Sequence, residues 1–462
     1  MPTPHPASER ISPQPGRTTF DRTTAMVLAF SGLGGVLYGY DIGAISGALL
    51  FMRPELGLNG AQMSLIVAAV LGGGSLATLI GGLAADLFGR KGIIKAAGIL
   101  FMLGVLILIS ATSFEVAMVG RLVQGIGVGL ITVVVPLYLI EVIHRDLRGR
   151  GITLFQLCLT FGILLGYVVD YAFSTSGDWR AMFATALVPA AVFVLGAFTL
   201  PQSPRWLYFR GRDSEARKLL MEMHGPEEAG SILQELETSA SHSGDAGSWK
   251  LFRLKKYWKA FAIALSIGML NQLTGVNSVL QFSSVILHQS GFSNTTAAIV
   301  GSTCVGLINF LMTALMLPLI DKFGRRPLLL SGTLGSAASF VLIGAVHCFS
   351  VPSALQGYVT LAGLLLFMAF FAMGPGIVAW LAISETLPLK IRAKGMSVTL
   401  FCNSLLSAGL AAIFMAAVAH LGYGGMFFVL ASFTALYAWV VWRFLPETRG
   451  LSLEEIEQHF LG

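Results

Sequence analysis

Charged side chains are scarce in this sequence. Asp, Glu, Lys and Arg make up 12% of its 462 residues, about half the share of ordinary soluble domains. Hydrophobic residues make up 55%, and there are 53 glycines, which fits membrane helices because glycine is frequent there and lets helices pack closely. The composition therefore argues against a soluble domain and predicts a protein that crosses the membrane several times.

Cysteine is scarcer still, and its spacing fits no metal site. The sequence also lacks a convincing nucleophile, metal-binding motif or phosphate-binding loop, and its glycine clusters are typical of helix packing. We expect neither an enzyme nor a bound cofactor. The four cysteines lie in or at the ends of apolar segments, where buried free thiols are the ordinary finding: Cys158, Cys304, Cys348 and Cys402.

Long apolar runs dominate the rest of the chain. A helix needs about 20 apolar residues to cross the bilayer. Residues 1–23 are polar with five prolines, which predicts a disordered cytoplasmic tail, so that the first span serves as its own insertion signal. Twelve runs are long enough to span: 24–51, 62–85, 93–113, 115–140, 151–173, 180–200, 257–287, 295–320, 328–349, 355–384, 394–419 and 422–445.

The basic residues predict the orientation of these spans. With both ends of the chain on one side, 27 of the 30 Lys and Arg residues fall in the tails and the inner loops. Only Arg53 and Arg180 fall outside, and Arg121 lies within a span. This pattern predicts cytoplasmic termini in the inner (plasma) membrane. The same pattern indicates that the basic residues behind the net charge of +6 contact anionic lipid headgroups and do not bind nucleic acid.

A polar segment, residues 203–254, separates six spans from six spans. We interpret it as a cytoplasmic linker with helices near 205–223 and 226–239, because it is too short and too poor in apolar residues for a separate domain. The predicted units on either side are an N-terminal bundle (24–202), a C-terminal bundle (255–446) and a C-terminal cytoplasmic helix (447–462).

The two halves repeat each other. "GGLAADLFGRK" (81–91) follows the second span and "LPLIDKFGRRP" (317–327) follows the eighth, at an offset of 235 residues. An acidic residue with a basic one seven positions later follows the fourth and the tenth spans, at an offset of 244. "PQSPRWL" and "PETRG" end the sixth and twelfth spans, at an offset of 245. Two parallel six-helix repeats with a site between them form a rocker-type transporter.

The charges of these loop motifs are candidates for a cytoplasmic gate. We expect them to lie at the inner helix ends and to latch the halves together when the protein faces outward. The alternative is that they only anchor the topology, but anchoring does not require acidic residues in register. The candidate gate residues are Asp86, Arg90, Glu141, Arg148, Asp321, Arg325, Glu385 and Arg392.

Six motifs occur in a fixed order: "GRLVQGIGVG" (120–129), "PLYLIE" (136–141), "PQSPRWL" (201–207), "NQLTGVN" (271–277), "ISETLPLKIRAKG" (383–395) and "PETRGLSLEEIE" (446–457). In order and spacing they resemble the sugar porter family of the major facilitator superfamily, over essentially the whole chain after residue 24, and most of all bacterial sugar/proton symporters. The resemblance implies an all-α membrane protein, with twelve transmembrane helices in two six-helix pseudo-repeats. We expect it to function as a monomer.

The resemblance also implies a set of sugar-binding residues. Amides suit sugars because they both donate and accept hydrogen bonds, and an aromatic ring packs on the apolar face of a sugar. A buried amide can instead hold helices together, but the clustering of amides at the family's cavity positions favours binding. The candidates are Tyr38, Gln156, Asn271, Gln272, Asn277, Gln281, Trp380 and Asn403.

The sequence departs from the family pattern around this site. Asn271 stands for the first glutamine of "QQxxGxN", and Gln281 stands for a tyrosine. Ser404 and Ser407 replace the tryptophan and the second asparagine of "NWxxN", and Gln202 replaces the glutamate of "PESPR". One aromatic wall of the cavity is lost and a polar group is added, so that a pentose, a hexose and an inositol-like polyol all remain open as substrates.

One carboxylate, Asp41, lies inside the apolar stretch "LYGYDIGAISG" (37–47). A charge in a span is costly, which indicates a function and a partner. Arg121 is the only basic residue deep in a span of the N-terminal half, and the resemblance places it facing Asp41. Pairing with Arg121 favours the charged form of the Asp41 carboxylate, and burial disfavours that form. If the helices that carry the two residues separate in one conformation, Asp41 binds a proton in only one conformation and acts as a proton switch. The alternative is a static ion pair. In the second half "GVN" aligns with "GYD" at an offset of 236, with neutral Asn277 in the place of Asp41.

These observations predict proton-coupled symport of a monosaccharide or polyol by alternating access, with the proton as the coupling ion. A facilitative sugar uniporter is the nearest alternative, and Asp41 is the position that discriminates between them. A membrane sugar sensor is an alternative of another class, but a sensor needs an output domain and the tails here have about 23 and 16 residues. An organic-acid carrier would need a cationic cavity, whereas Arg121 is already assigned to Asp41.

Overall fold

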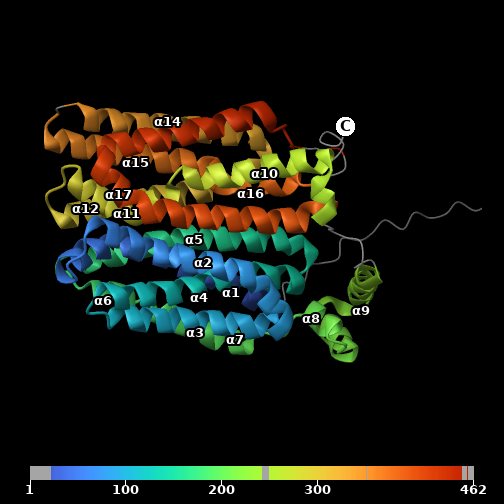
Figure 1. The fold of residues 1–462 in the computed structure, drawn as a ribbon. Coiled ribbons are helices and arrows are strands. Elements are labelled where there is room, and N and C mark those ends of the chain that lie inside the picture. The colour runs from blue at the N-terminus through green and yellow to red at the C-terminus, as the bar shows by residue number, and fades with distance from the viewer. Residues whose placement is uncertain (1–21, 242–248, 350, 450–454, 456–462) are drawn as a thin grey trace, which may run out of the picture.

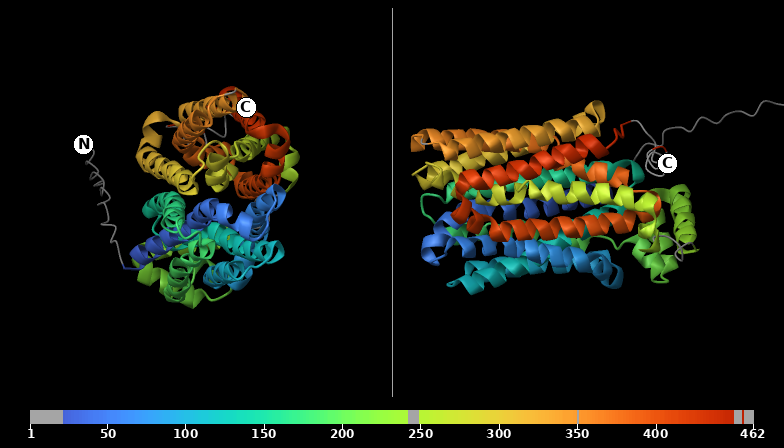
Figure 2. Two further views of the ribbon diagram at one scale, coloured as in Figure 1. Left: turned by 90° about the vertical axis from the view of Figure 1, so that its left-hand side faces the viewer. Right: turned by 45° about the horizontal axis from the view of Figure 1, so that its top comes forward.

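The computed structural model describes residues 22–241, 249–349, 351–449 and 455, and within these residues the chain is helical without strands. Two helical bundles, residues 22–199 and 255–444, lie side by side, and the segment 204–241 lies at one end of them (Figure 1). Seen end-on, each bundle is a ring of helices (Figure 2). We call the end that carries residues 204–241 the linker end and the opposite end the far end.

The N-terminal bundle comprises α1 (Arg22–Glu55), α2 (Gly60–Phe88), α3 (Arg90–Ile109), α4 (Phe114–Val142), α5 (Arg145–Ala172), α6 (Trp179–Ala184) and α7 (Leu187–Thr199). The segment between the bundles forms α8 (Pro204–Phe209) and α9 (Asp213–Ser241). The C-terminal bundle comprises α10 (Lys255–Leu273), α11 (Val276–Gln289), α12 (Thr295–Met316), α13 (Ile320–Phe323), α14 (Arg325–Cys348), α15 (Ser353–Met373), α16 (Pro375–Thr386) and α17 (Leu389–Phe444).

The predicted set of twelve spans is confirmed. Eleven helical segments among the described residues are long and apolar enough to cross a membrane. One of them, α17, has 56 residues and contains Gly422 with a non-helical φ of 68°, so it is two successive spans. The remaining differences are small: the helix expected near 205–223 is interrupted after α8, and α9 bends at Gly225. The predicted tail and C-terminal helix lie almost wholly outside the described residues.

Local sequence signals account for several helix ends. Asn59 caps α2, because its side chain accepts a hydrogen bond from the backbone N–H of Gln62 and the Gln62 side chain accepts one from the backbone N–H of Asn59. This capping box satisfies two backbone donors that would otherwise lack partners. At α8, Ser203 accepts from the backbone of Trp206, and Pro204 occupies the first helical position, where its missing N–H costs nothing.

Small residues let the helices of the N-terminal bundle approach closely. Along the long contact between α1 and α5, a Cβ placed on Gly166 would lie 2.6 Å from the backbone nitrogen of Ala44. A side chain at that position would push the two helices apart. This contact holds α1, and with it Asp41, against the wall of the bundle.

Two helices of the C-terminal bundle are broken near their middles. Gly275 separates α10 from α11 and adopts the left-handed conformation, with φ 76° and ψ 15°. Gly374 separates α15 from α16. Non-helical backbone at membrane depth is tolerated where it is buried in protein or lines a cavity, and discontinuous helices form the sites of many transporters. The breaks therefore indicate where a site should be sought.

We predict that Gly275→Ala lowers the free energy of unfolding by about 1–2 kcal/mol, because the left-handed conformation is costly for any residue with a Cβ. Denaturant titrations in detergent micelles measure the change. Gly409→Ala is the matched control, since it lies within α17 with nothing within 4 Å of an added Cβ. The control should be neutral or stabilising, and an equal loss in both variants would contradict the assignment.

Candidate functional site

A cavity of about 780 Å³ lies between the two bundles, at the level of the helix breaks. Its wall is mostly apolar and carries a few polar side chains, as expected of a small-molecule site. Both halves of the chain contribute to it. Seven of the eight predicted sugar-binding residues line the wall: Tyr38, Gln156, Asn271, Gln272, Asn277, Trp380 and Asn403.

The eighth, Gln281, does not line this cavity. It is fully buried on α11, and its side-chain amide donates to the backbone carbonyl of Asn277 at 3.3 Å. The structure therefore does not place Gln281 among the residues that line this cavity, although it lies one helical turn beyond Asn277 on α11.

The amides beside the break form a connected group. The side-chain nitrogen of Asn277 donates to the carbonyl oxygen of Gln272 at 3.0 Å and to the hydroxyl of Ser407 at 2.8 Å. Ser407 is one of the departures from the family pattern, and it fixes the orientation of Asn277. Asn403 donates to the backbone oxygen of Gly268 at 2.8 Å, so it joins α17 to α10 as well as facing the cavity.

Sequence reasoning missed several polar residues of the wall. Asn309 and Thr313 lie one turn apart on α12, and Thr160 lies on α5 one turn beyond Gln156. The available signal was a polar side chain inside an apolar span. That signal was ambiguous, because the face of a helix that meets the cavity depends on its packing.

The structure brings Asp41 and Arg121 together in the interior of the N-terminal bundle. Arg121 Nη1 lies 2.5 Å from Asp41 Oδ1, and both side chains are at most 1% exposed. The same nitrogen donates to the side-chain oxygen of Gln124 at 3.1 Å, and the guanidinium lies over the ring of Phe183. Tyr38, which lines the cavity, precedes Asp41 by one helical turn.

The ion pair is incompletely satisfied. Asp41 Oδ2, Arg121 Nε and Arg121 Nη2 are buried, and within the described part of the chain none of the three has a hydrogen-bond partner. A fork-to-fork pair would use two parallel hydrogen bonds, whereas this pair uses one. A buried pair of this kind is weak evidence for stability, which argues that it is kept for another reason.

A second buried carboxylate, Asp170, was overlooked in the sequence. It is fully buried on α5, and its Oδ2 accepts a hydrogen bond from the backbone N–H of Gly47 on α1 at 2.8 Å. Its Oδ1 has no hydrogen-bond partner among the described residues. Asp170 lies near the end of the apolar run 151–173, where a single acidic residue carries no clear signal of burial.

The cavity continues toward the linker end. A neighbouring hollow of about 490 Å³ shares Thr78, Val133 and Leu400 with the central cavity and reaches Asp86 and Lys394. The space between the two halves therefore extends to the ends of the helices beside α8.

Toward the far end, hydrogen bonds join the two halves. Ser46 on α1 contacts the hydroxyls of Ser283 and Ser284 on α11, each at 3.0 Å. Tyr167 on α5 donates to the backbone oxygen of Leu280 at 2.8 Å. These contacts hold the halves together at the far end while the cavity continues toward the linker end.

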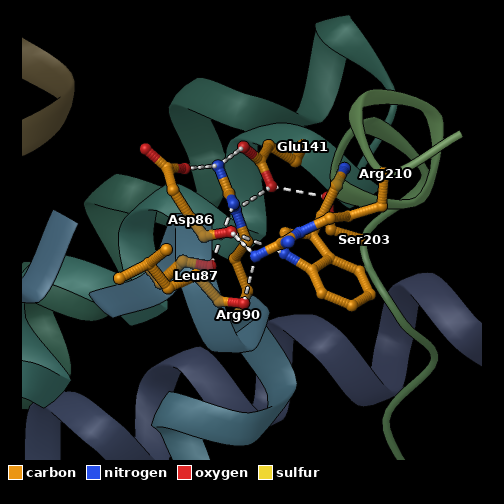
Figure 3. A network of polar contacts seen from close by, with 8 residues as sticks. Asp86, Leu87, Arg90, Glu141, Ser203 and Arg210 are labelled. Atoms are coloured by element: carbon orange, nitrogen blue, oxygen red, sulfur yellow. Dashed lines mark hydrogen bonds and ion pairs between the residues drawn. The ribbon is translucent and has the colours of Figure 1, made fainter. Parts of the chain in front are cut away.

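The loop charges of the N-terminal half form one cluster at the linker end. Arg90 bridges Asp86 at 2.8 Å and Glu141 at 2.8 Å, and Glu141 also accepts from Ser203 at 2.6 Å (Figure 3). Arg210, the residue that follows α8, donates to the backbone oxygens of Asp86 and Leu87 in the same view. The cluster therefore joins α2, α3, α4 and the start of α8.

The C-terminal half repeats these contacts at the repeat offsets. Arg325 bridges Glu385 at 3.3 Å, and Thr448 donates to Glu385 at 2.6 Å, as Arg90 and Ser203 do to Glu141. Arg148 and Arg392 each donate to the carbonyl oxygen five residues earlier. The side chain of Asp321 lies outside the described residues. These ion pairs join helices of the same half, and the predicted latch between halves stays a prediction.

The halves differ where Gln202 replaces a glutamate. In the C-terminal half Glu447 accepts from the backbone N–H groups of Arg325 and Arg326 at 3.0 and 3.1 Å, so a carboxylate caps the N-terminus of α14. Anions are stabilising at that position. The corresponding oxygen of Gln202 is buried and has no hydrogen-bond partner among the described residues.

Comparison with known proteins gives concordant results. The family described as "Sugar (and other) transporter" matches residues 27–460. The chain is 34% identical over 459 residues to the major myo-inositol transporter of Bacillus subtilis (strain 168), covering 97% of this chain and 96% of the relative. It is 32% identical over 442 residues to the galactose-proton symporter of Escherichia coli (strain K12), covering 95% and 94%.

A solved structure is similar over almost the whole fold. The partially occluded inward-open conformation of the xylose transporter from E. coli superposes with a TM-score of 0.80. Its sequence identity to this chain is 27%, and the match covers 94% of this chain and 100% of that chain.

We predict that Glu141→Ala and Asp86→Ala differ sharply in stability although both remove a partner of Arg90. The side chain of Glu141 is 3% exposed and that of Asp86 is 66% exposed. Loss of the buried carboxylate should cost about 3 kcal/mol, and loss of the exposed one less than about 1 kcal/mol. Denaturant titrations in detergent compare the two, and equal losses would show that burial does not set the strength of this cluster.

Proposed function

Because the chain belongs to the sugar transporter family, we propose that it carries a monosaccharide or polyol across the plasma membrane together with a proton. The observation that carries the proposal is the buried Asp41–Arg121 pair, one helical turn from the cavity residue Tyr38. It supplies a titratable group next to a site suited to a polyhydroxyl solute.

The cavity supports a sugar as the solute. Amide side chains from α5, α10, α11 and α17 offer both donors and acceptors to hydroxyl groups. Trp380, held on α16 after the break at Gly374, offers an aromatic face for the apolar side of a sugar ring. The relatives named above carry myo-inositol, galactose and xylose. Their names favour a monosaccharide or polyol as the substrate, and a substrate screen is needed to identify which one.

Proton coupling follows from separation of the ion pair. In the outward-facing protein Asp41 takes up a proton, and its attraction to Arg121 is lost. The cavity then tightens on the sugar, the halves rock, and the sugar leaves at the linker end. Asp41 releases its proton there and pairs with Arg121 again. The paired state with a cavity extending toward the linker end corresponds to the last step of this cycle.

We also propose an orientation of the chain in the membrane. We assign the linker end to the cytoplasm because the loops at that end hold the basic clusters. Both termini are then cytoplasmic, and the charge clusters of the two halves form the cytoplasmic gate. The protein functions as a monomer, since the cavity is built from one chain.

We predict that Asp41→Asn abolishes accumulation of sugar driven by a pH gradient but retains sugar exchange. The neutral amide resembles the protonated carboxyl, so the halves can rock without a proton. The measurement uses proteoliposomes with an imposed pH gradient and labelled pentoses, hexoses and inositols, followed by exchange at equal pH. Asp178→Asn is the matched control, because Asp178 is an exposed helix cap that asparagine can replace.

The results of these transport assays distinguish between the competing hypotheses for Asp41. Continued accumulation by Asp41→Asn would show that the coupling proton binds elsewhere. Loss of exchange together with accumulation would favour a static ion pair. Exchange without accumulation in the unaltered protein, for every sugar tested, would make it a facilitative uniporter.

We predict that Asn277→Ala weakens sugar binding by about tenfold, because it removes a hydrogen-bonding amide from the cavity and frees its partners Gln272 and Ser407. Half-saturation of exchange, or fluorescence titration, measures the affinity. Gln234→Ala, an exposed amide on α9, serves as the control. Unchanged affinity in Asn277→Ala would mean that this amide holds helices together without touching the solute.

A further inference from the structure

Two histidines and a glutamate converge at the linker end, away from the sugar cavity. His144 lies between α4 and α5, whereas His224 and Glu228 lie on α9. Within the described part of the chain they form the one group of three or more His, Cys, Asp or Glu side chains close enough to share a metal ion. The positive φ of Gly225, 76°, bends α9 between its two contributors.

The spacing of the ligand atoms matches a metal polyhedron. His144 Nδ1 lies 2.9 Å from Glu228 Oε2 and 3.2 Å from His224 Nδ1, and His224 Nδ1 lies 3.6 Å from Glu228 Oε1. Zinc binds imidazole nitrogen and carboxylate oxygen at about 2.0–2.1 Å, so neighbouring ligands of a tetrahedron stand about 3.4 Å apart. The three separations, of which the two to Glu228 involve different carboxylate oxygens, lie on either side of that value.

The orientation of the rings favours a shared cation. The ring centroids of His144 and His224 are 4.4 Å apart and the planes are inclined by 73°, so the rings meet edge to face and not as a stack. Their Nδ1 atoms face each other, and two neutral rings can share at most one proton along that line. A cation accepts both lone pairs, and the carboxylate of Glu228 supplies the negative charge.

Burial leaves one side of the group accessible. The side chain of His224 is 2% exposed, that of His144 is 17% exposed and that of Glu228 is 34% exposed. A cation bound here would keep a fourth position for water, as in zinc sites with three protein ligands. Two imidazoles and one carboxylate suit zinc and its first-row neighbours, whereas calcium and magnesium prefer oxygen ligands throughout.

We propose that His144, His224 and Glu228 form a binding site for a divalent transition metal of the zinc class. The bound metal fastens α9 to the junction of α4 and α5, three residues beyond Glu141 of the linker-end cluster. The proposal concerns a site outside the sugar cavity and holds whichever solute is carried.

The test is metal binding by the full chain, purified in detergent with an affinity tag that contains no histidine. The cysteines are alkylated first, because Cys304 and Cys348 are exposed and would bind metal. We expect titration with Zn²⁺ in a calorimeter to give one site per chain. His144→Ala and His224→Ala should each weaken it at least about tenfold, because loss of an outer-shell partner alone typically costs about 10–100-fold in metal affinity and these residues are direct ligands in the proposal.

His288→Ala and His420→Ala are the matched controls, since these histidines lie on other elements of the fold. Size-exclusion profiles show whether each variant is folded, and Glu228→Gln, which keeps the shape of the side chain, should also weaken binding. Paramagnetic resonance with Cu²⁺ should detect two imidazole nitrogens in the unaltered protein. Zinc affinity that survives both histidine substitutions, or that falls equally in the controls, would overturn the proposal.

Discussion

The hydrocarbon core of a membrane offers no hydrogen-bond partner to a peptide group, and this constraint shapes most of the molecule. The spans are helical because helices satisfy their own backbone, and a break is tolerated only where protein or a cavity replaces the lost bonds. The breaks at Gly275 and Gly374 both occur beside the central cavity. Each break turns polar or aromatic side chains toward that space, so the requirement for helices also locates the candidate site.

The same constraint makes the Asp41–Arg121 pair informative. Two desolvated charges are costly, and a pair that had been retained for stability would use both carboxylate oxygens and both arms of the guanidinium. Here one oxygen and two nitrogens are buried without partners among the described residues. In the other half, the corresponding position holds Asn277, whose side-chain nitrogen donates to Gln272 and to Ser407. One half thus holds an ion pair with unsatisfied buried atoms, whereas the other holds a neutral amide whose nitrogen has two hydrogen-bond partners.

Features of the fold and the site that depend on short segments of sequence could be predicted, whereas features that depend on how distant segments pack could not. Span lengths, the twofold repeat and the basic loops are properties of short segments, and the twelve spans follow from them. Gln281 lies one helical turn beyond Asn277 on α11, and only packing shows that Asn277 lines the cavity while Gln281 is fully buried. Asp170 and Asn309 are single polar residues in apolar runs, and only packing shows what they touch. The approach of His144 to His224 depends on how α9 folds back, which no local pattern predicts.

The charge clusters at the linker end show how a duplicated unit can move as a body. In each half an arginine, a glutamate and a hydroxyl join three segments, with Arg90, Glu141 and Ser203 matched by Arg325, Glu385 and Thr448. Because these contacts lie within one half, the proposed rocking of the halves would leave them in place. Rocking requires such internal cohesion, since helices that drifted independently would not carry the cavity walls together. The missing cap at Gln202 then leaves α3 in the N-terminal half more dependent on Arg90 than α14 is on Arg325, because Glu447 caps α14 directly.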